Sequence, residues 1–396
     1  MTGTTTPVRP PRRRARTVAG ETPPMHTPPP PTPGAHRADG PPVRLGVLVP
    51  LTRPGWTEAG RQLLAGLELG VRDVNAAGGI AGRPLELLVR DTAADPARAA
   101  AAVDELAGLD DVVAVAGEYH SVVARAAAAR ADAVGVPFLC SSAVLDELTD
   151  GPAQQVARLA PPQSQGWRTY ADFLLAAGRR RIAVASQPSV YWTSGTRILR
   201  DRLAAAGGTL LVLDADALAP EALCDALAAD GATALLLLAR HPEPAIPIVR
   251  AVRADRRLDG LLIGAPAGQP EFAGWAAALG ADGAGIPFLR YLPDRLGPLG
   301  ERVAAELRTR LGGAPSFVAF EGWDTAAVLA EALRTRGTDR AAVAGAWPHV
   351  SAEGTRGPIR FTRTAGTGVW QWAGAPVQVA DRDPARPDRF RVRHTG

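Results

Sequence analysis

Apolar strands alternate with amphipathic helices through residues 43–142, and the links between them are only a few residues long. The apolar runs have the continuous character of strands buried on both faces, and they cover 43–51, 84–91, 112–117 and 136–142. The segment between the first two repeats leucine and valine at helical spacing, and Asp95 followed by Pro96 marks the next helix start. Strands that each cross over through a helix run parallel, so this alternation predicts an open, doubly wound α/β sheet.

The same alternation begins again after residue 160, which predicts a second α/β half. The expected strands are 180–187, 209–215, 233–239 and 260–266, with helices at 194–206, 219–229 and 242–254 between them. Two later helices are expected at 299–311 and 323–337, and residues 357–384 are typical of a small antiparallel patch. The 396 residues are enough for two domains with sizeable cores.

The net charge of +4 lies in the N-terminal segment. Residues 1–42 hold six arginines against Glu21 and Asp39, so the rest of the chain is balanced. The body is therefore not expected to bind nucleic acid, and no apolar stretch approaches the ~20 residues of a membrane span. Twelve of the first 42 residues are proline, so we expect a disordered tail. It contains no apolar segment of a secretory signal, which favours a cytoplasmic location; a misassigned start site would instead allow export to the periplasm or cell surface.

Few residue patterns point to catalysis. The chain has no lysine, which excludes a P-loop lysine and a Schiff-base lysine. Cys140 and Cys224 have no C-x-x-C neighbour, and we interpret both as buried free thiols. Glu118, His120 and Ser121 lie together in "GEYHS", but side chains this close in a strand-to-helix turn are expected to point apart. We therefore expect no enzyme activity, no metal and no cofactor.

Polar residues follow the strands of both halves, at the edge where open α/β sheets bind ligands. Ser121 follows one strand, "CSSAV" (140–144) the next, and "SVYWTSG" (189–195) a strand of the second half. Each serine alone could be a helix cap. Three such turns, divided between the halves, favour a ligand cleft.

A long series of motifs carries a resemblance to a known family. "RLGVLVPL", "NAAGG", "RDTAADPARA", "GEYHS", "PFLCSSAVLDELTD", "VYWTSG", "FEGWDTAAVLAEAL" and "GTRGPIRF" follow one another between residues 43 and 362. In this order they resemble the periplasmic substrate-binding proteins of the branched-chain amino acid (Leu/Ile/Val) type, which serve ABC transporters. "GEYHS" is also similar to the corresponding turn of the cytoplasmic amide sensor of the same superfamily.

The resemblance implies a type 1 periplasmic binding protein fold, in which two lobes joined by a three-strand hinge close on a ligand. By analogy the chain crosses near Ala160, Leu289 and Thr355. Lobe one is then 43–160 plus 290–354, and lobe two is 161–289 plus 355–396.

The resemblance also assigns ligand-binding residues. The family's ligand-binding serine falls on Ser121, its carboxylate-binding loop on Ser142–Val144 and its lobe-two tyrosine on Tyr191. The complete candidate set is Trp56, Tyr119, Ser121, Ser141, Ser142, Ala143 and Tyr191.

The acidic residue that holds an amino acid's ammonium in the family is missing. It should lie within 264–268, which reads "GAPAG", and Glu118, Glu271 and Glu321 are the remaining substitutes. Because a buried ammonium needs an anionic partner, we expect a small ligand with a carboxylate or amide, an apolar remainder and no α-ammonium.

Two functions fit this resemblance. The first is the substrate-binding component of an ABC transporter, whose partner is a permease. The second is a cytoplasmic ligand sensor that regulates another protein.

Overall fold

The computed structural model describes residues 1–3, 40–363 and 368–396. The predicted tail, residues 1–42, therefore lies almost entirely outside the described part of the chain. Its last residues are described, and Arg83 donates hydrogen bonds to the carbonyl oxygens of Pro41 and Pro42. Among the helices of the described ranges, none combines the length and the apolar character that a membrane crossing requires.

A seven-stranded sheet forms the centre of lobe one, in the order β13-β14-β5-β4-β3-β1-β2. Its strands are β1 (Val43–Val49), β2 (Leu85–Asp91), β3 (Val112–Gly117), β4 (Phe138–Cys140), β5 (Val156–Arg158), β13 (Phe361–Arg363) and β14 (Trp370–Trp372). Neighbouring strands from β14 to β2 are parallel, and only β13 pairs antiparallel. The predicted parallel, doubly wound sheet is confirmed.

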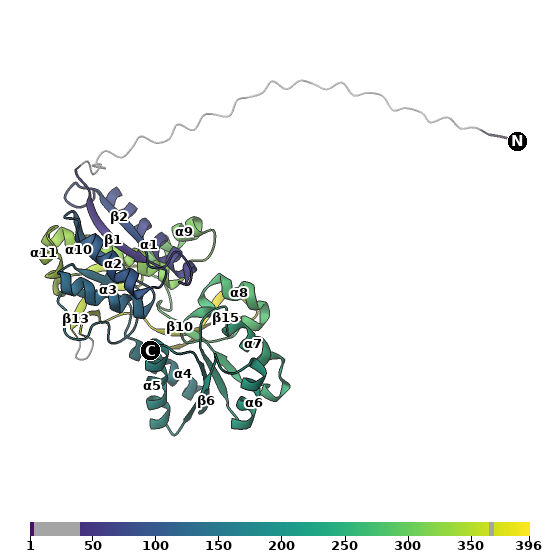
Figure 1. Ribbon diagram of the computed structural model, residues 1–396. Coiled ribbons are helices and arrows are strands. Elements are labelled where there is room, and N and C mark those ends of the chain that lie inside the picture. Colours follow the sequence, from purple (N-terminus) through teal and green to yellow (C-terminus); the bar gives the residue numbers. More distant parts are fainter. Residues whose placement is uncertain (4–39, 364–367) are drawn as a thin grey trace. The chain divides into compact units, whose positions relative to one another are not determined.

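Helices cover this sheet (Figure 1). They are α1 (Thr57–Ala76), α2 (Pro96–Ala107), α3 (Ser121–Val134), α9 (Pro298–Leu311), α10 (Phe317–Arg336) and α11 (Arg340–Ala344). The Asp95 carboxylate caps α2 by accepting from the N–H groups of Ala97 and Arg98, as predicted. Helix α1 packs along α10 so closely that a side chain at Gly66 or Gly322 would meet the backbone of the other helix.

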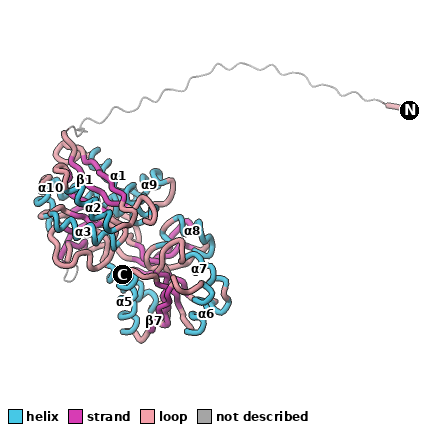
Figure 2. The backbone as a smooth tube through the Cα atoms, in the orientation of Figure 1, coloured by secondary structure: helices cyan, strands magenta, loops and turns pink. Residues whose placement is uncertain are grey.

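A four-stranded parallel sheet forms the centre of lobe two, in the order β7-β6-β8-β9. Its strands are β6 (Arg181–Ser186), β7 (Thr209–Asp214), β8 (Ala234–Leu238) and β9 (Leu262–Gly264). The helices are α4 (Gln163–Ala176), α5 (Val190–Ala205), α6 (Pro220–Asp230), α7 (Ala245–Ala254) and α8 (Ala273–Leu279). Figure 2 shows these helices and strands by type. Helix α5 begins at Val190 instead of the expected 194, so Tyr191 lies in its first turn.

Smaller elements complete the fold. A three-stranded antiparallel sheet contains β10 (Phe288–Arg290), β15 (Gln378–Asp383) and β16 (Arg386–Thr395), and a hairpin contains β11 (Ala352–Gly354) and β12 (Gly357–Ile359). Four short 3-10 turns are η1 (Arg256–Leu258), η2 (Gln269–Glu271), η3 (Gly280–Gly283) and η4 (Trp347–His349).

The strand pairing differs from the expected lobe boundary at the C-terminal end. Residues 355–396 were all expected in lobe two, but β13 and β14 extend the lobe-one sheet, since Trp370 pairs with Ala157 beside β5. Strand β15 pairs with β10 instead. We therefore propose that the last crossing between lobes lies between Trp372 and Gln378, and not near Thr355.

Candidate functional site

The turns after β3 and β4 are tied together by Ser121. Its hydroxyl oxygen accepts hydrogen bonds from the N–H groups of Val144 and Leu145, both at 3.3 Å. Ser121 is the first residue of α3, and the capping position before it, His120, makes no side-chain cap. Ser121 is therefore not a helix cap; it accepts twice and keeps its O–H proton as a donor.

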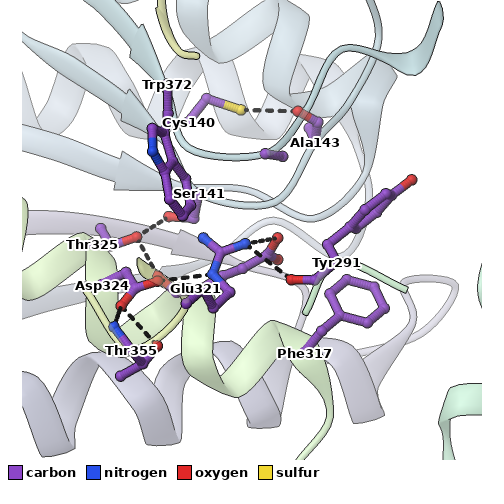
Figure 3. Close-up of polar contacts among 12 residues, drawn as sticks. Cys140, Ser141, Ala143, Tyr291, Phe317, Glu321, Asp324, Thr325, Thr355 and Trp372 are labelled. Atoms are coloured by element: carbon purple, nitrogen blue, oxygen red, sulfur yellow. Dashed lines mark hydrogen bonds and ion pairs between the residues drawn. The ribbon is translucent and has the colours of Figure 1, made fainter. Parts of the chain in front are cut away.

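The turn after β4 is buried and carries three of the predicted residues. Ser141 accepts a hydrogen bond from the Thr325 hydroxyl at 2.9 Å, and the carbonyl of Ala143 accepts from the Cys140 thiol (Figure 3). Ser142 is 4% exposed, and its hydroxyl has no hydrogen-bond partner in the described structure.

A buried ion cluster lies next to this turn. The Nε of Arg356 donates to Asp324 Oδ2 at 2.8 Å, and its Nη1 donates to Glu321 Oε1 at 3.2 Å. All three side chains are fully buried. Asp324 also accepts from the N–H and hydroxyl of Thr355, and the Tyr291 carbonyl accepts from Arg356 at 3.4 Å (Figure 3).

Glu321 is only half-satisfied by this cluster. Its Oε2 has no hydrogen-bond partner within the described residues. Burial raises the pKa of its carboxyl to about 7; Asp324 adds to the rise, whereas Arg356 and the nearby Ser142 hydroxyl oppose it. The Ser142 hydroxyl thus acts on the carboxyl, although neither Ser142 Oγ nor Glu321 Oε2 has a hydrogen-bond partner in the described structure.

The pKa values of Tyr119 and Tyr291 are both raised by burial, and Tyr191 and Glu321 contribute to both shifts. Burial raises the pKa of Tyr119 well above its usual value, and charge repulsion from Tyr191 and then Glu321 and Glu271 raises it further. Burial likewise raises the pKa of Tyr291, with Tyr191, Glu321 and Tyr119 adding to the effect. Both phenols therefore stay protonated at neutral pH and can donate hydrogen bonds.

Trp56 joins an aromatic cluster that links the lobes. Its ring contacts Tyr119 edge-on at 5.7 Å between centroids, and it contacts Phe272 of lobe two at 4.7 Å. Two residues after Trp56, the Glu58 carboxylate accepts hydrogen bonds from the N–H groups of Ala273 and Gly274, also in lobe two. Lobe one thus touches lobe two through both aromatic and polar contacts.

Among the predicted residues, the structure shows two groups in direct contact. Trp56 contacts Tyr119, and Ser121 holds the turn that contains Ser142 and Ala143. Tyr191 instead contacts Trp167 and Trp192. Sequence reasoning did not identify Tyr291 or Phe272, because each lies outside a strand-end turn with a recognised motif. The Ser141 hydroxyl already accepts a hydrogen bond from Thr325.

Glu118 and His120 differ from expectation. They do not point apart, because His120 Nδ1 lies 3.0 Å from Glu118 Oε1, which also accepts from the His120 N–H. The tight turn after β3 folds back on itself and allows this contact. The Nε2 of His120 accepts a hydrogen bond from the backbone N–H of Trp56 at 3.3 Å. The imidazole therefore makes its contacts away from the Ser121 hydroxyl.

The two cysteines are free and buried, as predicted. Burial raises the pKa of the Cys140 thiol to about 12, which makes it a poor nucleophile at neutral pH. Over the ranges 1–3, 40–363 and 368–396, no group of three or more His, Cys, Asp or Glu side chains is arranged to hold a metal ion.

Comparisons with known proteins agree with this architecture. "Leu/Ile/Val-binding protein homolog 7" of Brucella abortus (strain 2308) is 30% identical over 141 residues, which is 36% of this chain and 34% of that protein. The chain thus matches about a third of that relative's length. An ABC transporter substrate-binding protein from Desulfitobacterium hafniense, solved in complex with Leu, has a TM-score of 0.73 at 22% identity, covering 89% of this chain and 99% of that one. A solute-binding protein of an ABC transporter from R. palustris, solved with benzoate, has a TM-score of 0.73 at 19% identity, covering 90% and 97%.

The family model described as "Periplasmic binding protein" matches residues 42–383, nearly the whole described body. The chain therefore belongs to the periplasmic binding protein family.

Proposed function

We propose that this protein is the substrate-binding component of an ABC transporter of the branched-chain amino acid type, and that its two lobes close on a small organic ligand. The names of the relative and of the two solved structures support this role over that of a sensor, because they describe amino acid binding and ABC transport. The permease of such a transporter is the proposed partner.

One observation carries the proposal. Two buried polar atoms, Ser142 Oγ and Glu321 Oε2, have no hydrogen-bond partner in the described structure, and the Thr325 hydroxyl, one turn after Glu321, donates to Ser141 in the turn that carries Ser142. A buried polar atom without a hydrogen bond costs about 1–3 kcal/mol, so a group that satisfies these atoms would be bound favourably. The proposed ligand contacts are the candidate residues Trp56, Tyr119, Ser121, Ser142, Ala143 and Tyr191, with Ser141 in support.

The contacts of the GEYHS turn support binding without catalysis. A serine nucleophile needs a base within hydrogen-bond reach. Ser121 instead accepts from two backbone N–H groups, and His120 is engaged by Glu118 and Trp56. Such contacts orient a turn and are typical of a preformed binding site.

The family favours the exported location over the cytoplasmic one, because its members are described as periplasmic. We therefore propose that the protein works outside the cytoplasm, beside its permease. Cell fractionation of the native host tests this part alone: recovery of the protein only from the cytoplasm would contradict it.

Binding is tested by a thermal-shift screen with the twenty amino acids, their amides, the corresponding deaminated acids and benzoate. Small-angle scattering with and without each stabilising compound then tests closure. We expect a higher melting temperature and a smaller radius of gyration with the same compound. If no compound in the screen stabilised the protein, the proposed ligand class would be wrong; an unchanged radius at saturation would contradict closure.

A further inference from the structure

We propose that Glu321 is the ligand's nitrogen-binding residue: its free carboxyl oxygen, beside the Ser142 hydroxyl, accepts hydrogen bonds from an ammonium or amide N–H of the ligand. This inference rests on the proposed function and names the chemistry of the same site. It assigns a specific role to a side chain on α10, outside the strand-end turns from which sequence reasoning built the site.

The other two candidate glutamates are already engaged. Glu118 accepts from the Thr92 hydroxyl at 2.8 Å and from the His120 N–H at 2.9 Å. Glu271 accepts from Arg290 Nε at 2.8 Å with one oxygen and from the Phe317 N–H at 3.1 Å with the other. Both oxygens of each carboxylate thus already accept a hydrogen bond, whereas one oxygen of Glu321 accepts none.

Glu321 differs from them in having one oxygen unpartnered, although the whole residue is fully buried. Arg356 takes only Oε1. Glu321 lies one turn before Thr325 on α10, and the Thr325 hydroxyl donates to Ser141, the neighbour of Ser142 (Figure 3). In addition to burial, the charge of Glu321 contributes to the raised pKa values of Tyr119 and Tyr291. Tyr119 and Ser142 belong to the predicted ligand contacts. The contact between Thr325 and Ser141 thus brings the Glu321 turn of α10 against the turn that carries Ser142.

The local charge also favours a nitrogen donor. The charged groups that face Glu321 are Arg356 and Asp324, and the neutral titratable groups near it are Tyr119, Tyr291 and the Cys140 thiol. Two carboxyl groups thus share one guanidinium in a buried cluster. Buried charges are stable only when they are balanced, so an ammonium would provide the missing positive charge. An amide N–H would satisfy the same oxygen without charge.

This assignment replaces the expectation that the ligand lacks an α-ammonium. The expectation followed from the absence of a carboxylate in residues 264–268 of lobe two. In the structure, lobe one instead provides an acceptor, the unpartnered Oε2 of Glu321 on α10. The ligand class inferred from the structure therefore includes compounds that carry both a carboxylate and a nitrogen donor.

Matched pairs of compounds test the inference by calorimetry. L-Leucine is compared with 4-methylpentanoate, and L-phenylalanine with 3-phenylpropanoate; 4-methylpentanamide adds a neutral N–H. We expect each nitrogen compound to bind at least tenfold more tightly than its nitrogen-free partner. The variant Glu321→Gln should lose at least tenfold in affinity for the ammonium compounds. The control Glu331→Gln, ten residues further along the same helix and only partly buried, should stay within twofold of the wild type.

The pH dependence gives a second readout. With the pKa of Glu321 near 7, an ammonium ligand requires the ionised carboxylate and displaces its proton. Affinity for L-leucine or L-phenylalanine should therefore increase as the pH rises from 6 to 8, and this slope should be absent in Glu321→Gln. Binding of 4-methylpentanamide should depend on pH less strongly.

Each outcome has a definite meaning. Equal affinity for a nitrogen compound and its nitrogen-free partner, or unchanged affinity in Glu321→Gln, would overturn the inference while leaving the proposed function intact. If Glu321→Gln did not fold, Ser142→Ala should show the same selective loss for nitrogen compounds, and an unselective or absent loss would count against the inference. Failure of every compound in the wider screen would instead contradict the proposed function.

Discussion

The indole ring of Trp56 stacks on the imidazole ring of His241, with centroids 6.0 Å apart and ring planes inclined by 13°. Trp56 directly precedes α1 of lobe one, and His241 follows β8 of lobe two. The same imidazole contacts Trp275 at 5.8 Å on the lobe-two side. The stack is therefore a direct contact between lobes, and its strength depends on the protonation state of His241.

We predict that acid weakens this contact. Burial lowers the pKa of His241 below its ordinary value of 6.5, and only the neighbouring Glu58 opposes this effect. Because the unfolded chain then binds the proton more readily than the folded protein, this residue's contribution to stability is complete above pH 6.5 and is lost as the pH falls through the lower, folded-state pKa. The wild type should lose stability relative to His241→Phe between pH 7 and pH 5.

Urea denaturation of both proteins at several pH values measures this difference. His241→Phe keeps an aromatic ring against Trp56 but cannot be protonated, so it is the matched control for the stack itself. Parallel curves for the two proteins over that range would show that His241 protonation does not affect the fold.

Ser121→Ala should affect both stability and binding. The substitution leaves the N–H groups of Val144 and Leu145 without their acceptor, which we expect to cost about 1–3 kcal/mol of unfolding free energy. Loss of the O–H donor and of the turn's geometry should weaken ligand binding about 10- to 150-fold. Denaturation and calorimetry measure the two effects separately.

The exposed Ser351 provides the control, since Ser351→Ala should change neither quantity measurably. A Ser121→Ala variant with wild-type affinity but reduced stability would limit Ser121 to holding the turn. Wild-type stability would contradict the hydrogen bonds themselves.

The sequence predicts the parallel framework well because its strands are long, apolar and separated by amphipathic helices. The sequence does not predict strand β5, because Val156–Arg158 is too short to show a strand period. One of its pairing partners, β4, precedes it in the chain, and the other, β14, follows more than 200 residues later. Helix α4 was also missed, because Pro161 and Pro162 before it resemble a linker in sequence. The position of β14 depends on a long-range pairing that local pattern cannot reveal.

Only some residues of the candidate site can likewise be predicted from the sequence. Ser142 and Tyr191 are predictable because they follow strands in recognisable motifs. The state of Glu321 is not, since sequence alone gives Glu118, Glu271 and Glu321 equal standing, and only the positions of His120, Arg290 and Arg356 distinguish them. Those partners are between 2 and 35 residues away in the chain.

Gly322→Ala should destabilise the protein by about 1–3 kcal/mol or more. A Cβ atom at this position would meet the backbone of α1 at Leu63 and Leu67, which cannot move as a flexible side chain would. The gain of about 1 kcal/mol in helix propensity is too small to offset this clash. Gly108→Ala is the control, because its nearest contact would be an ordinary 3.4 Å and its backbone is already helical.

Denaturant unfolding of the two glycine variants tests this packing. Since Gly322 directly follows Glu321, a shift of α10 away from α1 should also reduce ligand affinity in Gly322→Ala. Equal stability of Gly322→Ala and Gly108→Ala would show that the two helices do not approach as closely as described.

The last prediction compares a buried arginine with an exposed one. Arg356→Met removes the only cation that contacts Glu321 and Asp324 in the described structure, while methionine retains much of the packing against Trp372. Two buried carboxyl groups would lose their partner, and such a loss typically costs 3–5 kcal/mol. Arg302 also contacts two carboxylates, those of Asp73 and Glu306, but its side chain is 44% exposed. Exposed pairs contribute at most about 1 kcal/mol, so Arg302→Met should change stability far less.

Because Asp324 and Glu321 become easier to protonate without Arg356, the stability of Arg356→Met should partly recover at acidic pH, whereas that of Arg302→Met should not. Denaturation of both variants at pH 5 and pH 8 measures the difference, and equal losses that do not depend on pH would contradict the role of Arg356 in balancing the buried cluster.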